Sequence, residues 1–86
     1  MLKIAVAIPV YNEKENILAL IEMIKNESKK NDWITEIVIV DDNSPDGTGE
    51  FVQNLNLSNV HLLRRRSKLG LDSAYLDGYR WATDKI

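Results

Sequence analysis

The sequence has no cysteine and only one histidine among its 86 residues. Without cysteine there is no disulfide framework, no thiolate nucleophile and no zinc–thiolate site. The histidine, His61, lies in an apolar segment and is expected to be structural. No apolar run approaches the roughly 18 residues of a membrane span. Residues 4–10 are too short, and too soon followed by Asn12 and Glu13, for us to expect a cleavable signal peptide.

The sequence also lacks a strong charge of either sign and two familiar nucleotide-binding motifs. A net charge of −2 gives no electrostatic case for binding nucleic acid or a membrane surface. There is no G-x-G-x-x-G after the first apolar segment and no G-x-x-x-x-G-K-[ST] anywhere. A dinucleotide site of the Rossmann type and a P-loop are therefore not supported. The apolar fraction of 44% and charged fraction of 28% are those of an ordinary soluble protein.

What the sequence does contain is an alternation of two periodicities. Residues 4–10 are a continuous apolar run, typical of a parallel strand buried on both faces, and residues 37–40 and 60–63 are expected to form two further short strands. Segments with helical spacing follow each of them. Strands that alternate with helices predict right-handed crossovers and a parallel sheet. We therefore expect an α/β fold, a three-layer, Rossmann-like βαβαβα unit that occupies residues 1–86 as one domain or part of one.

Each expected helix has a start signal and an apolar face. Asn12 with Glu15 three residues later matches a capping box. Ser44 followed by Pro45 predicts the start of a second, short helix that ends near Leu55. The apolar faces are expected to comprise Ile17, Leu20, Ile21 and Ile24 in the first helix, Phe51, Val52 and Leu55 in the second, and Leu71, Ala74, Tyr75, Gly78, Tyr79 and Ala82 in the third.

The unusual polar residues follow the three strands. The segments "PVYNE", "DDNSPDG" and "RRRSKLG" each begin where an expected strand ends. Parallel α/β sheets bind ligands just beyond the carboxyl ends of their strands. The sequence therefore predicts a ligand site at this edge.

The acidic pair Asp41 and Asp42 lies at the end of the second strand, so the two side chains should point to opposite faces. A carboxylate there can accept hydrogen bonds from a nucleobase or a ribose hydroxyl. It can equally help to ligate Mg²⁺. It can also simply shape a turn, because Asp, Asn, Ser, Pro and Gly all favour turns. The spacing alone leaves these readings open.

The other two loops offer further candidates. Tyr11 has a flat ring on which a base can stack, and Glu13 can either accept hydrogen bonds or favour a helix N-terminus. Among the cations we single out Lys68 as a candidate for a nucleotide diphosphate. Each single arginine of "RRR" is expected to lie on a solvated turn. Trp81, like the two tyrosines of the third helix, is expected to pack rather than bind a ligand.

Three segments taken together resemble a known family. "IAVAIPVYNEKENI", "IVIVDDNSPDGTGEFV" and "KLGLDSAYLDGYRWA" are similar to the N-terminal half of an inverting family 2 glycosyltransferase with a GT-A fold. Within that family they most resemble polyprenol (dolichyl) phosphate mannosyltransferases. The similarity extends from residue 4 to residue 82.

The resemblance implies an activity and a set of roles. The activity is hexosyl transfer, of mannose from GDP-mannose to a polyprenyl phosphate, in the cytoplasm or at the cytoplasmic face of a membrane. Asp41, Ser44 and Asp46 would shape the turn and cap the next helix. The residues implied to bind the nucleotide sugar are Pro9, Tyr11 and Glu13 around the base and ribose, Val40 and Asp42 at the base, and Lys68 near the diphosphate.

The sequence departs from the family pattern in two places. Asp72 stands where relatives often have glycine. More important, there is no Asp-x-Asp motif, whose carboxylates hold Mg²⁺ or Mn²⁺ in the family and follow a helix like the third one here. We therefore predict no catalytic residue, no metal ligand and no tightly bound metal in this chain, and no sugar transfer by the chain alone. Its first strand should have an open edge, which invites a second copy or a C-terminal half to pair with it.

Two other classes of function stay open. One is a stand-alone nucleotide-binding or assembly module without catalysis. The other is a receiver-like, Mg²⁺-binding signalling domain, since acidic strand ends also build phosphoacceptor sites. The second is disfavoured because its acidic residues should converge from two strands, whereas the first strand here ends in "PVYNE".

Overall fold

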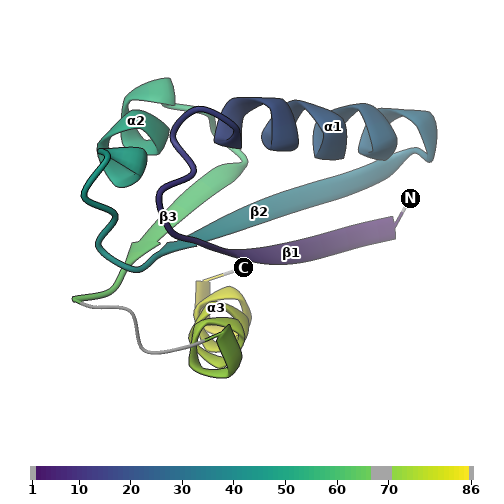
Figure 1. The fold of residues 1–86 in the computed structure, drawn as a ribbon. Coiled ribbons are helices and arrows are strands. Elements are labelled where there is room, and N and C mark those ends of the chain that lie inside the picture. The colour runs from purple at the N-terminus through teal and green to yellow at the C-terminus, as the bar shows by residue number, and fades with distance from the viewer. Residues whose placement is uncertain (1, 67–70, 86) are drawn as a thin grey trace.

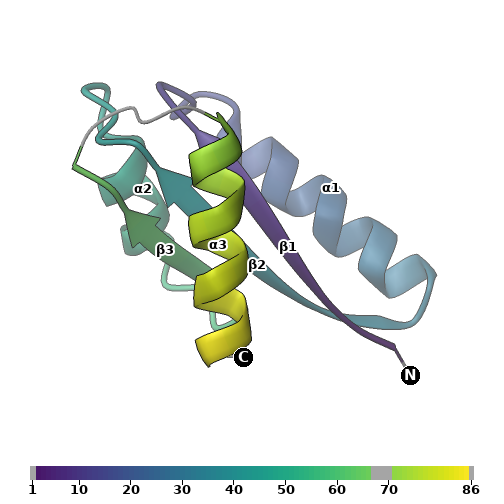
Figure 2. The ribbon, with the colours of Figure 1, turned by 90° about the horizontal axis from the view of Figure 1, so that it is seen from below.

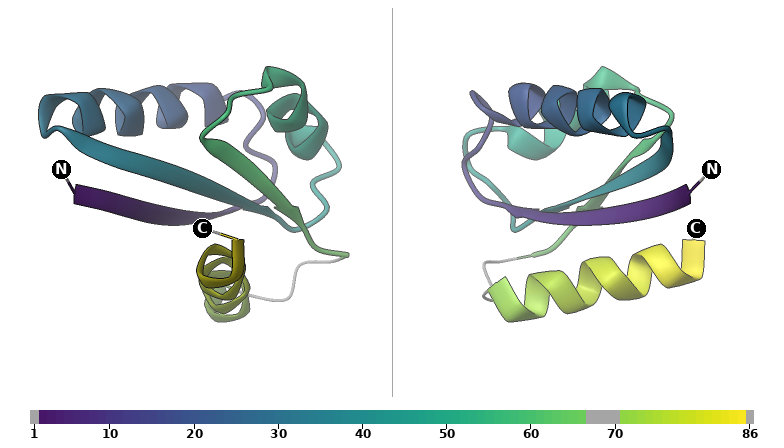
Figure 3. Two further views of the ribbon diagram at one scale, coloured as in Figure 1. Left: turned by 180° about the vertical axis from the view of Figure 1, so that it is seen from behind. Right: turned by 90° about the vertical axis from the view of Figure 1, so that its right-hand side faces the viewer.

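The structure, a computed structural model, describes residues 2–66 and 71–85. Strands and helices alternate, and the three strands form a parallel sheet in the order β1-β2-β3 (Figure 1). The helices α1 and α2 lie on one side of the sheet and α3 on the other (Figures 1 and 3). The elements are β1 (Leu2–Val10), α1 (Ile17–Lys30), β2 (Trp33–Asp41), α2 (Thr48–Leu55), β3 (Val60–Arg64) and α3 (Leu71–Lys85). The predicted α/β fold with three layers is confirmed.

The strand register brings the three strand ends together. Val10 of β1 lies opposite Asp41 of β2, and Asp41 lies opposite Arg64 of β3. The loops that follow these strands therefore leave the sheet at one edge, as the sequence predicts.

The side of the sheet that faces α1 and α2 is packed with large branched side chains. Ile37 and Ile39 of β2 are fully buried there against the predicted stripe of α1. All four residues of that stripe and all three predicted apolar residues of α2 belong to this cluster. Burial of this kind contributes about 25 cal/mol for each Å² of apolar surface removed from water.

The other side of the sheet is packed with smaller residues. Val38 and Val40 of β2 are buried against Ala74 of α3. A Cβ on Gly78 would lie 2.9 Å from the Cβ of Ala7 and 3.0 Å from a methyl of Val40. The absence of a side chain at Gly78 thus lets α3 approach β1 and β2, over which it lies in Figure 2.

The end of α3 is fixed by aromatic contacts. The rings of His61 and Trp81 lie 4.9 Å apart between centroids. Nε2 of His61 lies 3.1 Å from Oε1 of Glu36 on the neighbouring strand. His61 therefore connects two strands and a helix, in agreement with its expected structural role, and Trp81 packs as expected.

The predicted burial of Tyr75 and Tyr79 is wrong. Their exposed fractions are 53% and 67%. Because Ala74 and Gly78 make the close contact with the sheet, the tyrosines lie beyond it, where they line an open groove of about 690 Å³ together with Ala5 of β1.

The prediction that residues 4–10 are buried on both faces is also wrong. Only Val10 of β1 is buried, and Ala5 is exposed. The reason is that β1 pairs only with β2 within the described sheet, so its second edge is open. The expected open edge is confirmed for the described residues.

Two helix starts differ from the sequence prediction. The helix α1 begins at Ile17 rather than near Asn12, and no side chain caps it. The helix α2 begins at Thr48 after Gly47, whose φ of 86° is in the left-handed region that glycine tolerates. Two of the expected capping side chains have other partners: Oδ1 of Asn12 accepts the N–H of Asp46 at 3.4 Å, and the hydroxyl of Ser44 donates to Asp41.

Candidate functional site

The loops after β1 and β2 are joined by side chains of the second loop. The backbone N–H of Asn12 donates to Oγ of Ser44 at 2.9 Å. The next N–H, of Glu13, donates to Oγ1 of Thr48 at 3.0 Å. Amide groups that would otherwise be unpaired at the start of the first loop are thus satisfied by hydroxyls.

Asp46 extends this connection by one residue. One carboxylate oxygen accepts the N–H of Lys14 at 3.1 Å, and the other accepts the N–H and the hydroxyl of Thr48 at 3.0 and 2.5 Å. The hydrogen bond from the Thr48 hydroxyl is the main reason that the pKa of Asp46 lies below its ordinary value of 3.8. Asp46 holds the two loops together and orders the start of α2, the role implied for it.

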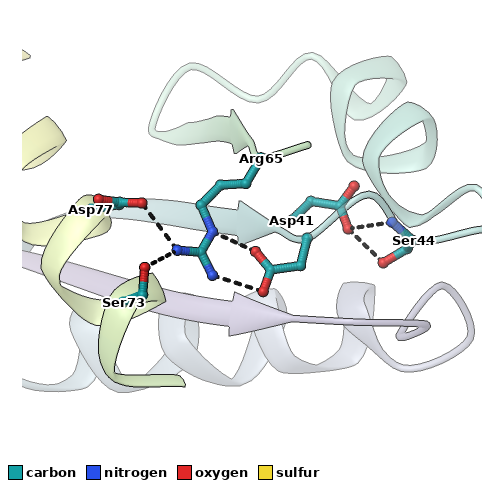
Figure 4. Close-up of polar contacts among 6 residues, drawn as sticks. Asp41, Ser44, Arg65, Ser73 and Asp77 are labelled. Carbon is teal, nitrogen blue, oxygen red and sulfur yellow. Dashed lines mark hydrogen bonds and ion pairs between the residues drawn. The ribbon is translucent and has the colours of Figure 1, made fainter. Parts of the chain in front are cut away.

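Asp41 faces α2. Its Oδ1 accepts the hydroxyl of Ser44 at 2.5 Å and the N–H of Ser44 at 3.3 Å (Figure 4). Its Oδ2 is buried without a hydrogen-bond partner in the described part of the chain. A Cβ on Gly49 would lie 2.7 Å from this oxygen. Asp41 therefore shapes the turn, as expected, in a space that only glycine leaves open.

Asp42 faces α3 and is held by Arg65. Nε of Arg65 donates to Oδ1 of Asp42 at 2.5 Å, and Nη2 donates to Oδ2 at 2.8 Å. Such bidentate pairs fix the plane of the carboxylate as well as its position. The side chains of Arg65 and Asp42 are only 5% and 7% exposed, so solvent screens this pair far less than a surface salt bridge.

Arg65 is itself held from α3. Its Nη1 donates to Oγ of Ser73 at 2.7 Å and to Oδ2 of Asp77 at 3.0 Å (Figure 4). The hydrogen bond to Asp42 raises the pKa of Arg65 well above its ordinary value, and the effect exceeds the opposing effect of burial. The expectation that each arginine of "RRR" is solvated is wrong for Arg65. A local signal did exist: Ser73 and Asp77 are four residues apart, on one face of a helix.

The predicted nucleotide-binding residues lie as follows. Pro9 lies opposite Val40 in the β1–β2 register, and Tyr11 and Glu13 follow directly beyond the strand end, close to the loop that begins with Asp42. Pro9 and Glu13 also line an open groove of about 420 Å³ beside α1.

The remaining two predictions concern Val40 and Lys68. The side chain of Val40 is buried in the core against α3. Lys68 lies outside the described residues. The binding roles of all six residues stay predictions.

The described residues do not fit a metal ion. Within residues 2–66 and 71–85, no three acidic or histidine side chains lie close enough together to hold one. The carboxylate of Asp41 is directed at Ser44, and that of Asp42 is bound on both oxygens by Arg65. The described helices also include none with the length and apolar character needed to cross a membrane.

Comparison with known proteins adds the decisive observation. The family model described as "Glycosyl transferase family 2" matches residues 5–86. The chain belongs to glycosyl transferase family 2. The resemblance in the three loop segments is thereby confirmed, and the family match spans both the loops and the helices that position them.

Three curated proteins are similar to this chain. A polyprenol monophosphomannose synthase of Mycolicibacterium smegmatis is 40% identical over 79 residues, which are 88% of this chain and 28% of that protein. A dolichol-phosphate mannosyltransferase of Pyrococcus furiosus is 40% identical over 86 residues, 99% of this chain and 24% of that protein. An undecaprenyl-phosphate mannosyltransferase of Micrococcus luteus is 33% identical over 86 residues, 98% of this chain and 34% of that protein. The chain therefore spans 24–34% of the length of these relatives.

Proposed function

We propose that the chain is the N-terminal, nucleotide-sugar-binding portion of a hexosyltransferase that transfers mannose from GDP-mannose to a polyprenyl phosphate. The names of the three relatives, two of them mannosyltransferases and one a monophosphomannose synthase, support mannose and a polyprenyl phosphate acceptor. The observation that carries the proposal is the placement of Tyr11, Glu13 and Asp42 beyond the ends of adjacent parallel strands in a chain of this family.

Guanine suits the chemistry of this edge. Asp42 is paired with Arg65, so its carboxylate offers acceptors only. Guanine presents adjacent N–H donors at N1 and N2, and uracil presents one at N3, whereas adenine has an acceptor at the corresponding ring nitrogen and a donor only at its exocyclic N6. Tyr11 is exposed next to the strand end and supplies a ring for stacking. Asp42 would therefore select guanine or uracil over adenine.

Transfer requires groups that the described residues do not supply. A divalent cation that offsets the charge of the departing nucleoside diphosphate would be held by an Asp-x-Asp motif, which this sequence lacks. We assign the cation, the acceptor site and the general base to the remaining length of a family enzyme. We assign to that same part the strand that covers the open edge of β1, where apolar grooves lie on both faces. The chain alone then binds the donor nucleotide and does not transfer sugar.

The test is an NMR titration of the isotopically labelled chain with GDP, UDP and ADP, with and without Mg²⁺. We expect shifts confined to Tyr11, Glu13, Val40 and Asp42, with GDP bound about tenfold more tightly than ADP, the effect of one good hydrogen bond. Mg²⁺ should not alter the affinity. Equal binding of all three nucleotides, or none, would contradict the proposal.

Two further measurements on the same sample complete the test. Incubation with GDP-mannose and a polyprenyl phosphate should give no mannolipid, and a single turnover would disprove the assignment of catalysis to another part. Light scattering measures the oligomeric state of the chain, and this indicates what pairs with the open edge of β1. A monomer agrees with a C-terminal partner, whereas a dimer that Ala5→Lys abolishes would assign the edge to a second copy of the chain.

A further inference from the structure

Arg65 is the buried member of three consecutive arginines, and its contacts differ from those of its neighbour. Arg64 pairs with Glu50 at the surface, where both side chains are about half exposed. Arg65 is 5% exposed and, among the described residues, contacts Asp42 after β2 and both Ser73 and Asp77 of α3. Burial of a charge is tolerated only where partners satisfy it, so the position of this guanidinium is closely determined.

We propose that Arg65 is the positioning residue of the nucleotide site, which fixes the carboxylate of Asp42 for the base and is itself fixed from α3 by Ser73 and Asp77. This inference rests on the proposed function. It assigns Arg65 no contact with the nucleotide: Arg65 acts through Asp42.

The first step is the effect of Arg65 on Asp42. The side chain of an aspartate at a strand end can rotate about two bonds, and a single hydrogen bond leaves one rotation free. Arg65 binds both oxygens with two parallel N–H groups, at 2.5 and 2.8 Å. The rigid, planar guanidinium therefore sets the plane of the carboxylate. Each oxygen keeps a further lone pair, in a defined direction, for a donor on the ligand.

The second step is the effect of α3 on Arg65. Ser73 and Asp77 both accept hydrogen bonds from Nη1, and removal of acceptors from a buried donor is costly. Both residues lie on the same face of α3, one turn apart. The side chain of Asp77 is 35% exposed, so it can be changed without opening the core. The position of α3 thus determines, through Arg65, the orientation of the Asp42 carboxylate at the proposed nucleotide site.

The experiment compares Arg65→Lys and Asp77→Asn with the matched control Arg64→Lys. Lysine keeps the charge at position 65 but loses the two parallel hydrogen bonds. For Arg65→Lys we expect the preference for GDP over ADP to fall about tenfold, and for Asp77→Asn about threefold, since a weakened contact has a smaller effect than a lost one. The control should keep the preference of the unaltered chain. If both variants weaken all nucleotides alike, Arg65 is merely structural and the proposal is overturned.

A second readout does not depend on nucleotide binding. The Nε–H of Arg65 should give a protected proton signal in the unaltered chain, and Asp77→Asn should make this proton exchange with solvent at least severalfold faster. Arg64→Lys should leave its exchange unchanged. Fast exchange in the unaltered chain would overturn the positioning role even if GDP binds. If the signal is protected and Asp77→Asn speeds its exchange, but no nucleotide binds, the proposed function fails and the linkage from α3 through Arg65 to Asp42 stands. Asp77→Asn covers the case in which Arg65→Lys does not fold.

Discussion

The two sides of the sheet are held by different means. Against α1 and α2, the sheet buries large branched side chains such as Ile37 and Ile39. Against α3, two valines of the sheet pack at close approach against an alanine and a glycine of the helix, and a charged cluster lies at the end of the interface. The first interface is stabilised by apolar volume, and the second is specified by fit and by hydrogen bonds.

The acidic pair follows the same division. Asp41 turns towards α2 and the turn that precedes it, whereas Asp42 turns towards Arg65 and α3. The alternation of side chains along a strand predicts this opposition. The comparison shows that two adjacent carboxylates have different partners, and so different roles, because they face different layers.

The largest expected effect is on the side of α1 and α2. Ile39→Ala removes branched volume from the centre of that core and should lower the free energy of unfolding by about 3 kcal/mol, as buried isoleucines do elsewhere. Urea denaturation followed by circular dichroism measures the change. Met23→Ala, at an exposed position on α1, is the matched control and should cost less than about 0.5 kcal/mol. If Ile39→Ala lowers the free energy of unfolding no more than Met23→Ala does, apolar volume does not stabilise this side of the sheet.

A smaller effect is expected on the side of α3. Gly78→Ala places a Cβ within 3.0 Å of Ala7 and Val40, so it should lower the free energy of unfolding by about 1–2 kcal/mol through overpacking. On a helix free of such contacts the same change stabilises by up to about 1 kcal/mol. The sign of the change in thermal unfolding therefore decides whether close approach determines this interface. Leu76→Ala, on the exposed side of α3, should leave the midpoint nearly unchanged.

The smallest effect concerns Asp46 and appears only in acid. Its folded-state pKa lies below the ordinary value of 3.8 because of the Thr48 hydroxyl. The ionised form therefore contributes stability that is fully present above the ordinary value and is lost as the pH falls through the lower folded value. In Asp46→Asn, this part of the decline in urea midpoint should disappear. Asp84→Asn, at an exposed position on α3, should keep it. An unchanged acid profile in Asp46→Asn would show that the loop connection does not depend on the charge.

The fold could be predicted from the sequence because its signals are local. Short, mainly apolar runs identified the three strands, and the stripe of α1 from Ile17 to Ile24 identified the face that is buried. The helix starts could not be predicted in the same way. Asn12 and Ser44 are residue types that often cap helices. Here the backbone N–H of Asn12 donates to the hydroxyl of Ser44, 32 positions further along the chain, and no local pattern reveals this interaction.

The site was predictable in part for the same reason. That Asp41 and Asp42 point apart follows from strand geometry alone, and it is confirmed. That Tyr75 and Tyr79 are exposed depends on the depth to which Gly78 allows α3 to approach, which is a property of two packed elements. That Arg65 is buried depends on partners 8 and 12 residues further along the chain.

The hydrogen bonds between the first two loops have a consequence for protein engineering. Consecutive backbone amides after β1 are satisfied by side chains that the β2–α2 segment supplies. The conformation of "PVYNE" therefore depends partly on the side chains of "DDNSPDGT". A chimera that takes only one of these segments from another family member has the amides of one protein and the acceptor side chains of the other. The two segments should therefore be exchanged together.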